Sequence, residues 1–379
     1  MFRKNKNAMP QRRIAARKRT FIKSFAITAC SASTIIIALL IVWNIMLSPP
    51  DQREIIAASP DDTDRHTVDE DGFLVVDTTF EDDDGDCPWP THNAPSWAVD
   101  RREYFWTFLI IGLNEGTNAN TIMVASYCGV TRQANLVSIP RDIPVHPDRN
   151  GRKLSSSYII GAAAGRGIEG GVAQMQRDVQ TIIGFVPDYY VVIDYDAFFQ
   201  IIDAVDGIEV YVPIRMRYED PYQNLSIDIQ PGLQHMDSET ALHFSRFRQA
   251  NRNTPYPSLR YGDLDRARNQ QAVINAVISR LLSVENLNPV RINEFIGIFN
   301  ESVHTNMSSF TDMPFFANEL RHIGGLENLS TYMFDTHGGM VNGVSYQFLT
   351  PSAVVELVNR TINPFYGDIA VTDLRIVRP

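Results

Sequence analysis

The chain has 379 residues and a formal net charge of −10, enough length for one large domain or two small ones with a substantial core. The acidic balance argues against nucleic-acid binding. Three cysteines and eight scattered histidines without zinc-type spacing give no basis for a zinc site or a disulfide scaffold. The chain has no phosphate-binding Gly-Lys loop, dinucleotide fingerprint or Gly-x-Ser-x-Gly elbow, which argues against the enzyme classes that use them.

The N-terminal part predicts a single membrane anchor. Residues 1–24 carry nine Lys and Arg and no acid, and Phe25–Leu47 is a run of 23 residues without a charge. Roughly 20 apolar residues span a bilayer as a helix, and basic flanks stay in the cytoplasm. We therefore expect a cytoplasmic tail (1–24), a transmembrane helix (25–47) and an extracytoplasmic remainder. The alternative is a cleaved signal peptide, but the run is too long and no clear small-x-small site follows it.

Residues 48–103 have the composition of an acidic linker. Asp51–Asp86 contains fourteen acids, and such segments rarely collapse into a core. The acidic cluster Asp82–Asp86 lacks the full calcium-loop pattern and its final Glu, so we interpret it as part of a solvated spacer. Cys87 and Cys128 both lie on the outer side, but two cysteines give no spacing pattern that predicts a disulfide.

Apolar runs and turn residues then predict alternating strands and helices. The expected strands are Phe105–Ile111, Thr121–Tyr127, Asn135–Ile139, Tyr189–Ile193 and Ile208–Ile214. The expected helices are Glu169–Ile183, ended by Gly184; Ala197–Val205, ended near Gly207; a short helix capped by Asp237 after a loop over 215–236; Leu264–Leu282; and two that begin at Pro289 and Pro351. This interleaving predicts an α/β or α+β sheet covered by helices.

The helix 264–282 presents two polar side chains at the edge of its apolar face. At about 100° per residue, Arg266 and Gln270 lie about 80° and 40° from Ile274, the centre of that face. Arg268 lies about 160° from Arg266 and should point to solvent. We interpret Arg266 and Gln270 as candidates for a pocket rim. The alternative for Arg266 is an ion pair with Asp263 on the preceding turn.

Three further arginines are candidates for the same site. If residues 246–248 are extended, Arg246 and Arg248 share one side and Phe247 packs inward; the alternative is a surface strand with two solvated charges. Arg141 follows an apolar run where a strand feeds a loop, a common position for a site. Several guanidinium groups aimed at one place suit a phosphorylated or pyrophosphorylated ligand. The predicted anchor suggests that a lipid carries it.

Two residues near Arg141 are weaker candidates for the same site. Lys153 is a further phosphate candidate, although a lone lysine is more often simply exposed. We interpret Asp142 as the partner that holds Arg141 rather than as a catalytic base.

The apolar stretch Ala197–Ile202 and the strand 189–193 are candidates for lining a lipid tunnel, and ordinary core packing is the alternative.

Nine sequence blocks occur in the order and spacing of a known family. The blocks are Phe108–Asn114, Asn120–Met123, Val137–Asp142, Lys153–Tyr158, Asp188–Asp194, Val205–Val210, Gly232–Met236, Phe244–Arg248 and Asp263–Gln271. With them the chain resembles LytR-CpsA-Psr (LCP) proteins. The resemblance is good over residues 105–285 and looser to about 365, which suggests an LCP domain over 104–285 and a helical and strand extension over 286–379 that packs on it or continues it.

The resemblance implies an LCP-type mixed central β-sheet flanked by helices, with a deep apolar pocket for a polyprenyl chain. It implies a membrane-anchored phosphotransferase that attaches a teichoic-acid-like or capsular glycopolymer from a polyprenyl-pyrophosphate carrier to peptidoglycan. Arginines and a metal ion would neutralise the charge that develops while a sugar hydroxyl attacks. The implied catalytic residues are Arg141, Asp142, Arg246, Arg248, Asp263 and Arg266. The implied pyrophosphate-binding residues are Arg141, Lys153, Arg246, Arg248, Arg266 and Gln270.

The chain departs from the family at the metal-binding positions. Asn114 and Asn120 stand where the family usually has Asp residues that help hold Mg²⁺, and Asn269 stands where an Arg is common. An amide offers only a neutral oxygen, whereas Mg²⁺ prefers carboxylates. We therefore expect weakened Mg²⁺ binding. Two alternatives to a transferase follow: a domain that binds polyprenyl pyrophosphates with weak or no transfer, and a lipid pyrophosphatase with water as acceptor.

Overall fold

The computed structural model describes residues 48–50, 67–68, 73–75, 101–114, 118–145, 153–223, 225–260, 262–283, 289–323 and 325–377. The basic tail, the expected transmembrane helix 25–47 and most of the linker, including Cys87, lie outside these residues. Within the described ranges, no helix combines the length and the apolarity that crossing a membrane requires.

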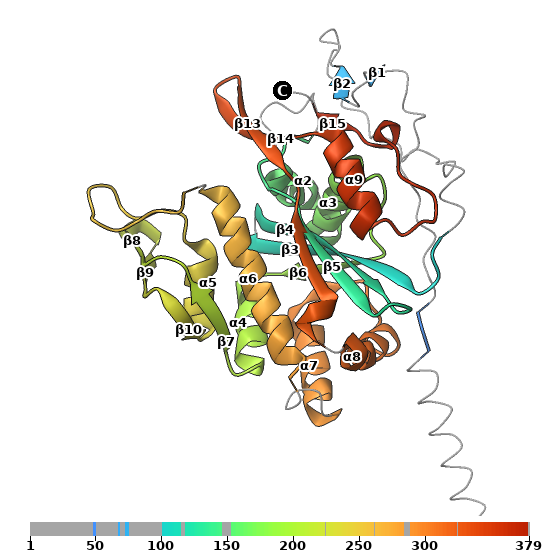
Figure 1. Cartoon of the computed structure of the whole chain (residues 1–379), viewed down its shortest axis with the longest axis horizontal. Helices are drawn as coiled ribbons and strands as arrows, with labels where there is room; N and C mark the ends of the chain where they lie inside the picture. Colours follow the sequence, from blue (N-terminus) through green and yellow to red (C-terminus); the bar gives the residue numbers. More distant parts are fainter. Residues whose placement is uncertain are drawn as a thin grey trace, which may run out of the picture.

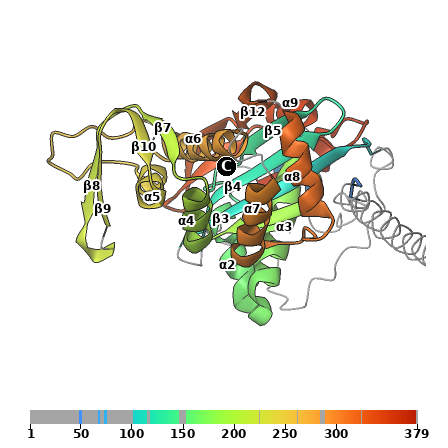
Figure 2. The ribbon, with the colours of Figure 1, turned by 90° about the horizontal axis from the view of Figure 1, so that it is seen from below.

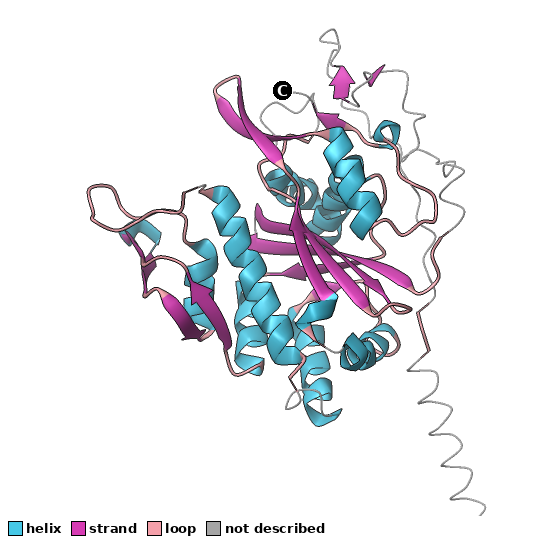
Figure 3. Cartoon of the chain, in the orientation of Figure 1, coloured by secondary structure: helices cyan, strands magenta, loops and turns pink. Residues whose placement is uncertain are grey.

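A six-stranded mixed sheet forms the centre of the domain, in the order β11-β6-β3-β4-β5-β12 (Figures 1 and 3). β3, β4 and β5 form an antiparallel meander, and β6 and β12 extend it with parallel pairing to β3 and β5. The mixed central sheet expected from the sequence is confirmed. The strands are β3 (Phe105–Asn114), β4 (Asn118–Cys128), β5 (Gln133–Ser138), β6 (Tyr189–Ile193), β11 (His304–Thr305) and β12 (Leu329–Met333).

The two faces of the sheet contact different sets of helices, because successive residues of a strand point to opposite sides. Leu109 and Ile111 of β3 pack into a core with α3 and α9, whereas Phe108 and Ile110 face α6, α7 and α8. Figures 1 and 2 show these two layers. The helices are α2 (Ser157–Gly161), α3 (Gly167–Ile183), α6 (Asp263–Leu281), α7 (Pro289–Ser302), α8 (Asp312–Ile323) and α9 (Pro351–Thr361).

Several helix boundaries follow from local signals in the sequence. α3 ends at Gly184, which has φ +85° and so takes the left-handed conformation that favours glycine. The Asp237 carboxylate accepts a hydrogen bond from the Thr240 N–H at 2.9 Å and caps α5 (Ser238–Arg246). α7 and α9 begin at the prolines expected to start them. These four boundaries are confirmed.

The prediction of a loop over residues 215–236 is wrong. It contains β8 (Met216–Asp220), β9 (Leu225–Ile229) and β10 (Gly232–Met236). β8 pairs with β9, and β10 pairs with β7 (Ile208–Val212). Their alternate apolar residues share a second core with α5 and α6. Apart from the exposed Leu233 of β10, the outward positions carry charged and polar residues, so each five-residue strand has too few apolar positions to stand out from a loop.

The segment after residue 285 completes the central sheet. β11 and β12 are its two edge strands, α8 covers one face beside α6 and α7, and α9 belongs to the core on the opposite face. α2, α8 and β12 were not expected from the sequence.

Candidate functional site

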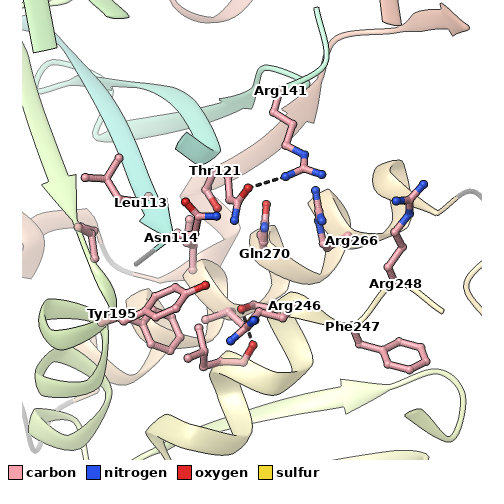
Figure 4. Close-up of a pocket in the computed structure, with 18 of the residues that line it drawn as sticks. Leu113, Asn114, Thr121, Arg141, Tyr195, Arg246, Phe247, Arg248, Arg266 and Gln270 are labelled. Carbon is pink, nitrogen blue, oxygen red and sulfur yellow. Dashed lines mark hydrogen bonds between the residues drawn. The ribbon is translucent and has the colours of Figure 1, made fainter. Parts of the chain in front are cut away.

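A cavity of about 470 Å³, here called the basic pocket, lies at one end of the central sheet. It is bordered by the end of β3, the start of β4, the loop after β5, the start of α4 (Tyr195–Ala204), the end of α5 and the first half of α6. Figure 4 shows the side chains of four arginines and Gln270 around it. The arginines are Arg141, Arg246, Arg248 and Arg266.

The local structure at Arg246 and Arg248 differs from the expected strand. Arg246 is the last residue of α5, and Phe247 turns the chain to an extended conformation with φ −60° and ψ 132°. Phe247 is buried in the second core. This buried ring separates the helix end from the following loop, and both arginines still line the pocket. The extended segment on which the predicted arrangement depended is therefore not formed, although Phe247 is buried all the same.

The positions of the polar residues along α6 agree with the helical periodicity. Arg266 and Gln270, one turn apart, both line the basic pocket. Arg268 points away and forms an ion pair with Asp265, with its side chain 57% exposed. Asn269 is buried and donates a hydrogen bond to the Phe244 carbonyl, so it ties α6 to α5. Asp263 begins α6, but its side chain lies outside what the structure describes.

Arg141 reaches the basic pocket from the loop after β5. Its Nη1 donates a hydrogen bond to the side-chain oxygen of Asn120, which lies near the start of β4. Asn114, at the end of β3, accepts a hydrogen bond from the Asn118 N–H at 2.8 Å. Thus the sheet end and the following loop together position one guanidinium group and two amide oxygens.

Lys153 and Asp142 are not brought into this pocket. The Lys153 ammonium lies 2.9 Å from the Asp142 carboxylate and 5.7 Å from the centre of the Tyr346 ring. Asp142 lines a small neighbouring cavity of about 20 Å³. Asp142 therefore pairs with Lys153, and the expectation that it holds Arg141 is wrong. The reason is tertiary: an isolated bridge between Pro144 and Lys153 brings the later segment back beside Asp142.

The described side chains of the basic pocket do not fit a Mg²⁺ site. The oxygens of Asn114 and Asn120 are neutral and already accept hydrogen bonds. Among the described residues that line the pocket, Asp194 is the acid, and its Oδ1 accepts the Ala197 N–H at 2.9 Å to cap α4. The described part of the chain holds no cluster of three His, Cys, Asp or Glu residues able to bind a metal. Mg²⁺ is normally held by carboxylates together with phosphate and water.

Tyr195 is a pocket residue that the sequence reasoning missed. Its ring lies 5.6 Å from the Arg246 guanidinium, within the range of a cation–π interaction. Tyr195 and the helix cap Asp194 directly follow the buried strand β6. Arg141 was chosen as a candidate because it is a polar residue at the end of an apolar run. The same criterion would have identified Asp194 and Tyr195.

A second cavity of about 370 Å³, here called the apolar cavity, lies between the sheet and helices α6, α7 and α8. Almost all of its lining is aliphatic or aromatic, and Ile110 and Ile274 line both this cavity and the basic pocket. The two spaces therefore adjoin. Along α6, Gln270 faces the basic pocket, while Ile278 and Leu281 face the apolar cavity.

The apolar cavity is not where the sequence placed a lipid tunnel. Ala197 and Ile202 are buried in the ordinary core, which was the alternative interpretation. Phe198 and Ile193 line the basic pocket instead. The helices that cover the apolar cavity are α6, α7 and α8, and two of them follow residue 285.

Comparisons with known proteins agree with one another. A model described as the LytR_cpsA_psr family matches residues 98–363. Biofilm regulatory protein A of Streptococcus mutans is 24% identical over 270 residues, which cover 67% of this chain and 62% of that protein. The polyisoprenyl-teichoic acid–peptidoglycan teichoic acid transferase TagV of Bacillus subtilis is 26% identical over 222 residues, 57% of this chain and 53% of TagV. The chain thus spans less than two thirds of the length of these relatives.

Two solved structures share the fold. The crystal structure of B. subtilis TagV has a TM-score of 0.54 and 20% identity, and the match covers 68% of this chain and 96% of the TagV chain. A structure of TagT bound to LIIa-WTA has a TM-score of 0.51 and 19% identity over 68% of this chain and 89% of that chain.

Proposed function

The chain belongs to the LytR_cpsA_psr family, and from that premise we propose that it transfers a phosphorylated glycopolymer from a polyprenyl-pyrophosphate carrier to peptidoglycan. The name of the relative TagV describes a transfer of this type. The observation that carries the proposal is the junction of two cavities: four arginines line one, and aliphatic and aromatic side chains line the other. A lipid diphosphate has the same two parts, a charged head and an apolar tail.

The basic pocket suits the charge changes of such a reaction. A sugar hydroxyl attacks the phosphorus that carries the glycopolymer, and the bond from this phosphorus to the bridging oxygen breaks. The polyprenyl monophosphate leaves with that electron pair, and the hydroxyl proton passes to solvent. Negative charge therefore grows on the leaving phosphate. Fixed guanidinium donors stabilise this charge distribution, because they are oriented before the reaction begins.

The apolar cavity would hold the first isoprenoid units of the carrier. From Gln270 to Ile278, α6 advances about 12 Å at about 1.5 Å per residue, so the head and the tail would lie along one helix. A cavity of about 370 Å³ with an apolar lining is unusual for a packed domain, and an isoprenoid chain would cover its walls.

Filling the apolar cavity should therefore weaken lipid binding selectively. We expect Ile278→Trp, which places a larger ring in the cavity, to reduce the affinity for a long-chain polyprenyl diphosphate at least tenfold, because the added ring takes the space of the tail. Binding of inorganic pyrophosphate should change less than twofold. Ser279→Trp, the next residue on α6 and exposed, is the matched control. Fluorescence titration of both variants measures the effect, and equal affinities for the lipid would contradict a tail in this cavity.

Membrane anchoring by residues 25–47 belongs to the same proposal, with the folded part outside the cell. Phe108 and Tyr127 line the part of the apolar cavity remote from Asn114, and β3 starts at that same end with Phe105. The chain preceding the domain thus enters beside the end where the lipid tail would leave. A chain whose anchor and lipid-tail exit lie at the same end of the domain could take its lipid carrier directly from the membrane.

The proposed reaction is tested by product analysis. The protein is incubated with a radiolabelled polyprenyl-pyrophosphate saccharide and a peptidoglycan fragment. We expect a labelled saccharide joined through a phosphodiester to the fragment, and release of polyprenyl monophosphate. A free saccharide phosphate that forms at the same rate without the fragment would instead identify a pyrophosphatase. Carrier binding without either product would identify a binding domain, the alternative suggested by Asn114 and Asn120.

A further inference from the structure

We propose that the basic pocket binds its diphosphate without a divalent cation, and that Arg141, oriented by Asn120, supplies the charge that a metal ion would otherwise supply. The inference rests on the proposed function, since it concerns how the same diphosphate is held. Asn120 is thus a positioning residue in this site: it acts through Arg141 and need not touch the ligand.

The first support is the state of the two amide oxygens. The Asn120 oxygen accepts the Arg141 Nη1–H, and the Asn114 oxygen accepts the Asn118 N–H at 2.8 Å. A cation would have to displace both donors and would receive only neutral oxygens in return. Carboxylates are the protein groups that offset the loss of water from Mg²⁺. Neither position provides one.

The second support is the charge of the pocket. Its described lining contains four arginines and one carboxylate, that of Asp194, and one oxygen of this carboxylate already caps α4. Among the described lining residues, positive side chains thus outnumber negative ones, a balance that disfavours a cation and favours an anion. A diphosphate with a substituent at each end is such an anion, with about two negative charges, one for each phosphate.

The third support is what an amide does for Arg141 that a carboxylate cannot. An aspartate at position 120 would form an ion pair with this guanidinium and cancel its charge unless a metal ion were bound between them. The amide oxygen of Asn120 accepts a hydrogen bond from Arg141 and helps to orient it, and, unlike a carboxylate, it places no negative charge beside the guanidinium group. The replacement of acid by amide and the arginine contact are therefore parts of one arrangement.

The test compares wild type with Asn120→Asp and Asn114→Asp/Asn120→Asp in two measurements. The first is the binding of a fluorescent prenyl diphosphate in EDTA and in Mg²⁺. We expect wild type to bind equally in both, within twofold. In EDTA, Asn120→Asp should bind at least tenfold more weakly, because its new carboxylate neutralises Arg141. The double variant should be equally weak in EDTA and recover in Mg²⁺. Arg141→Gln should be weak in both media, and Arg268→Gln should match wild type.

The second measurement is Mn²⁺ binding to the protein without lipid, followed by the electron paramagnetic resonance signal of free Mn²⁺. We expect the double variant to bind one Mn²⁺ that wild type does not bind. A wild-type Mn²⁺ site that Asn114→Ala/Asn120→Ala removes would overturn the inference. Wild-type lipid binding that requires Mg²⁺ would also overturn it, yet would leave the proposed function intact. Absence of lipid binding in both media would reject the proposed function and this inference together.

Discussion

Arg266→Gln is expected to lower the rate of glycopolymer transfer by roughly 10²–10³-fold, the usual effect of removing one preorganised donor from a developing negative charge. Arg266 lines the basic pocket, and glutamine keeps the side chain polar while shortening it and removing its positive charge. The loss should appear mainly in kcat, because the charge on the leaving phosphate increases as the reaction proceeds.

The control for this prediction lies two residues along the same helix. Arg268 points to solvent and pairs with Asp265, so Arg268→Gln should leave the transfer rate within twofold of wild type. Both variants make the same chemical change in α6, and thermal unfolding should show similar stability for the two. Initial rates at saturating lipid give the comparison. Equal losses of activity in both variants would mean that Arg266 acts through general electrostatics or stability rather than at the reacting phosphates.

Asp188→Asn is expected to reduce the free energy of unfolding by about 3–5 kcal/mol, the usual cost of breaking a buried ion pair from one side. The Asp188 carboxylate, 1% exposed, pairs with the Arg101 guanidinium, 12% exposed. It also accepts hydrogen bonds from the Thr107 N–H and hydroxyl at 2.8 and 2.9 Å. These contacts join β3 and the segment before it to the residue that directly precedes β6.

The energetics of this pair lead to a second expectation. Burial raises the pKa of Asp188 above its ordinary value, although Arg101 and Thr107 act in the opposite direction. For the Asp188 carboxylate, the attraction to Arg101 therefore does not fully offset the cost of its own removal from water. Arg101→Met/Asp188→Asn should consequently be more stable than Asp188→Asn alone, because it leaves no unpaired charge. Urea unfolding of the three proteins measures both effects. A double variant less stable than the single one would show that the pair itself is strongly stabilising.

Parts of the candidate site could be predicted because they depend on one helix or one chain segment. The spacing of Arg266, Arg268 and Gln270 determines their directions once residues 264–282 are helical. The structure agrees for all three. The position of Arg141 after an apolar strand was similarly informative. Lys153 and Asp142 could not be placed this way, because their ion pair depends on how the segment after residue 145 returns to the loop after β5.

The apolar cavity was mislocated for a related reason. Apolar residues at helical spacing line a cavity or fill a core equally well, because both environments exclude water. Phe198 and Ile278 are both apolar residues of helices, yet Phe198 borders the basic pocket and Ile278 borders the apolar cavity. Whether space remains beside a side chain depends on how closely α7 and α8 approach the sheet. This separation cannot be predicted from a local sequence pattern.

The amino-acid sequence by itself determined the helix ends at Gly184 and Asp237, the faces of α6 and the two amides at Asn114 and Asn120, because hydrogen bonds and periodicity over a few residues govern such features. Tertiary structure alone decided that β8 and β9 pair, that Arg246 and Arg248 reach one pocket from a helix end and a loop, and that Asn120 holds Arg141. These contacts join residues that are distant in the chain or separated by a turn, so their geometry exists only once the sheet and its covering helices have packed.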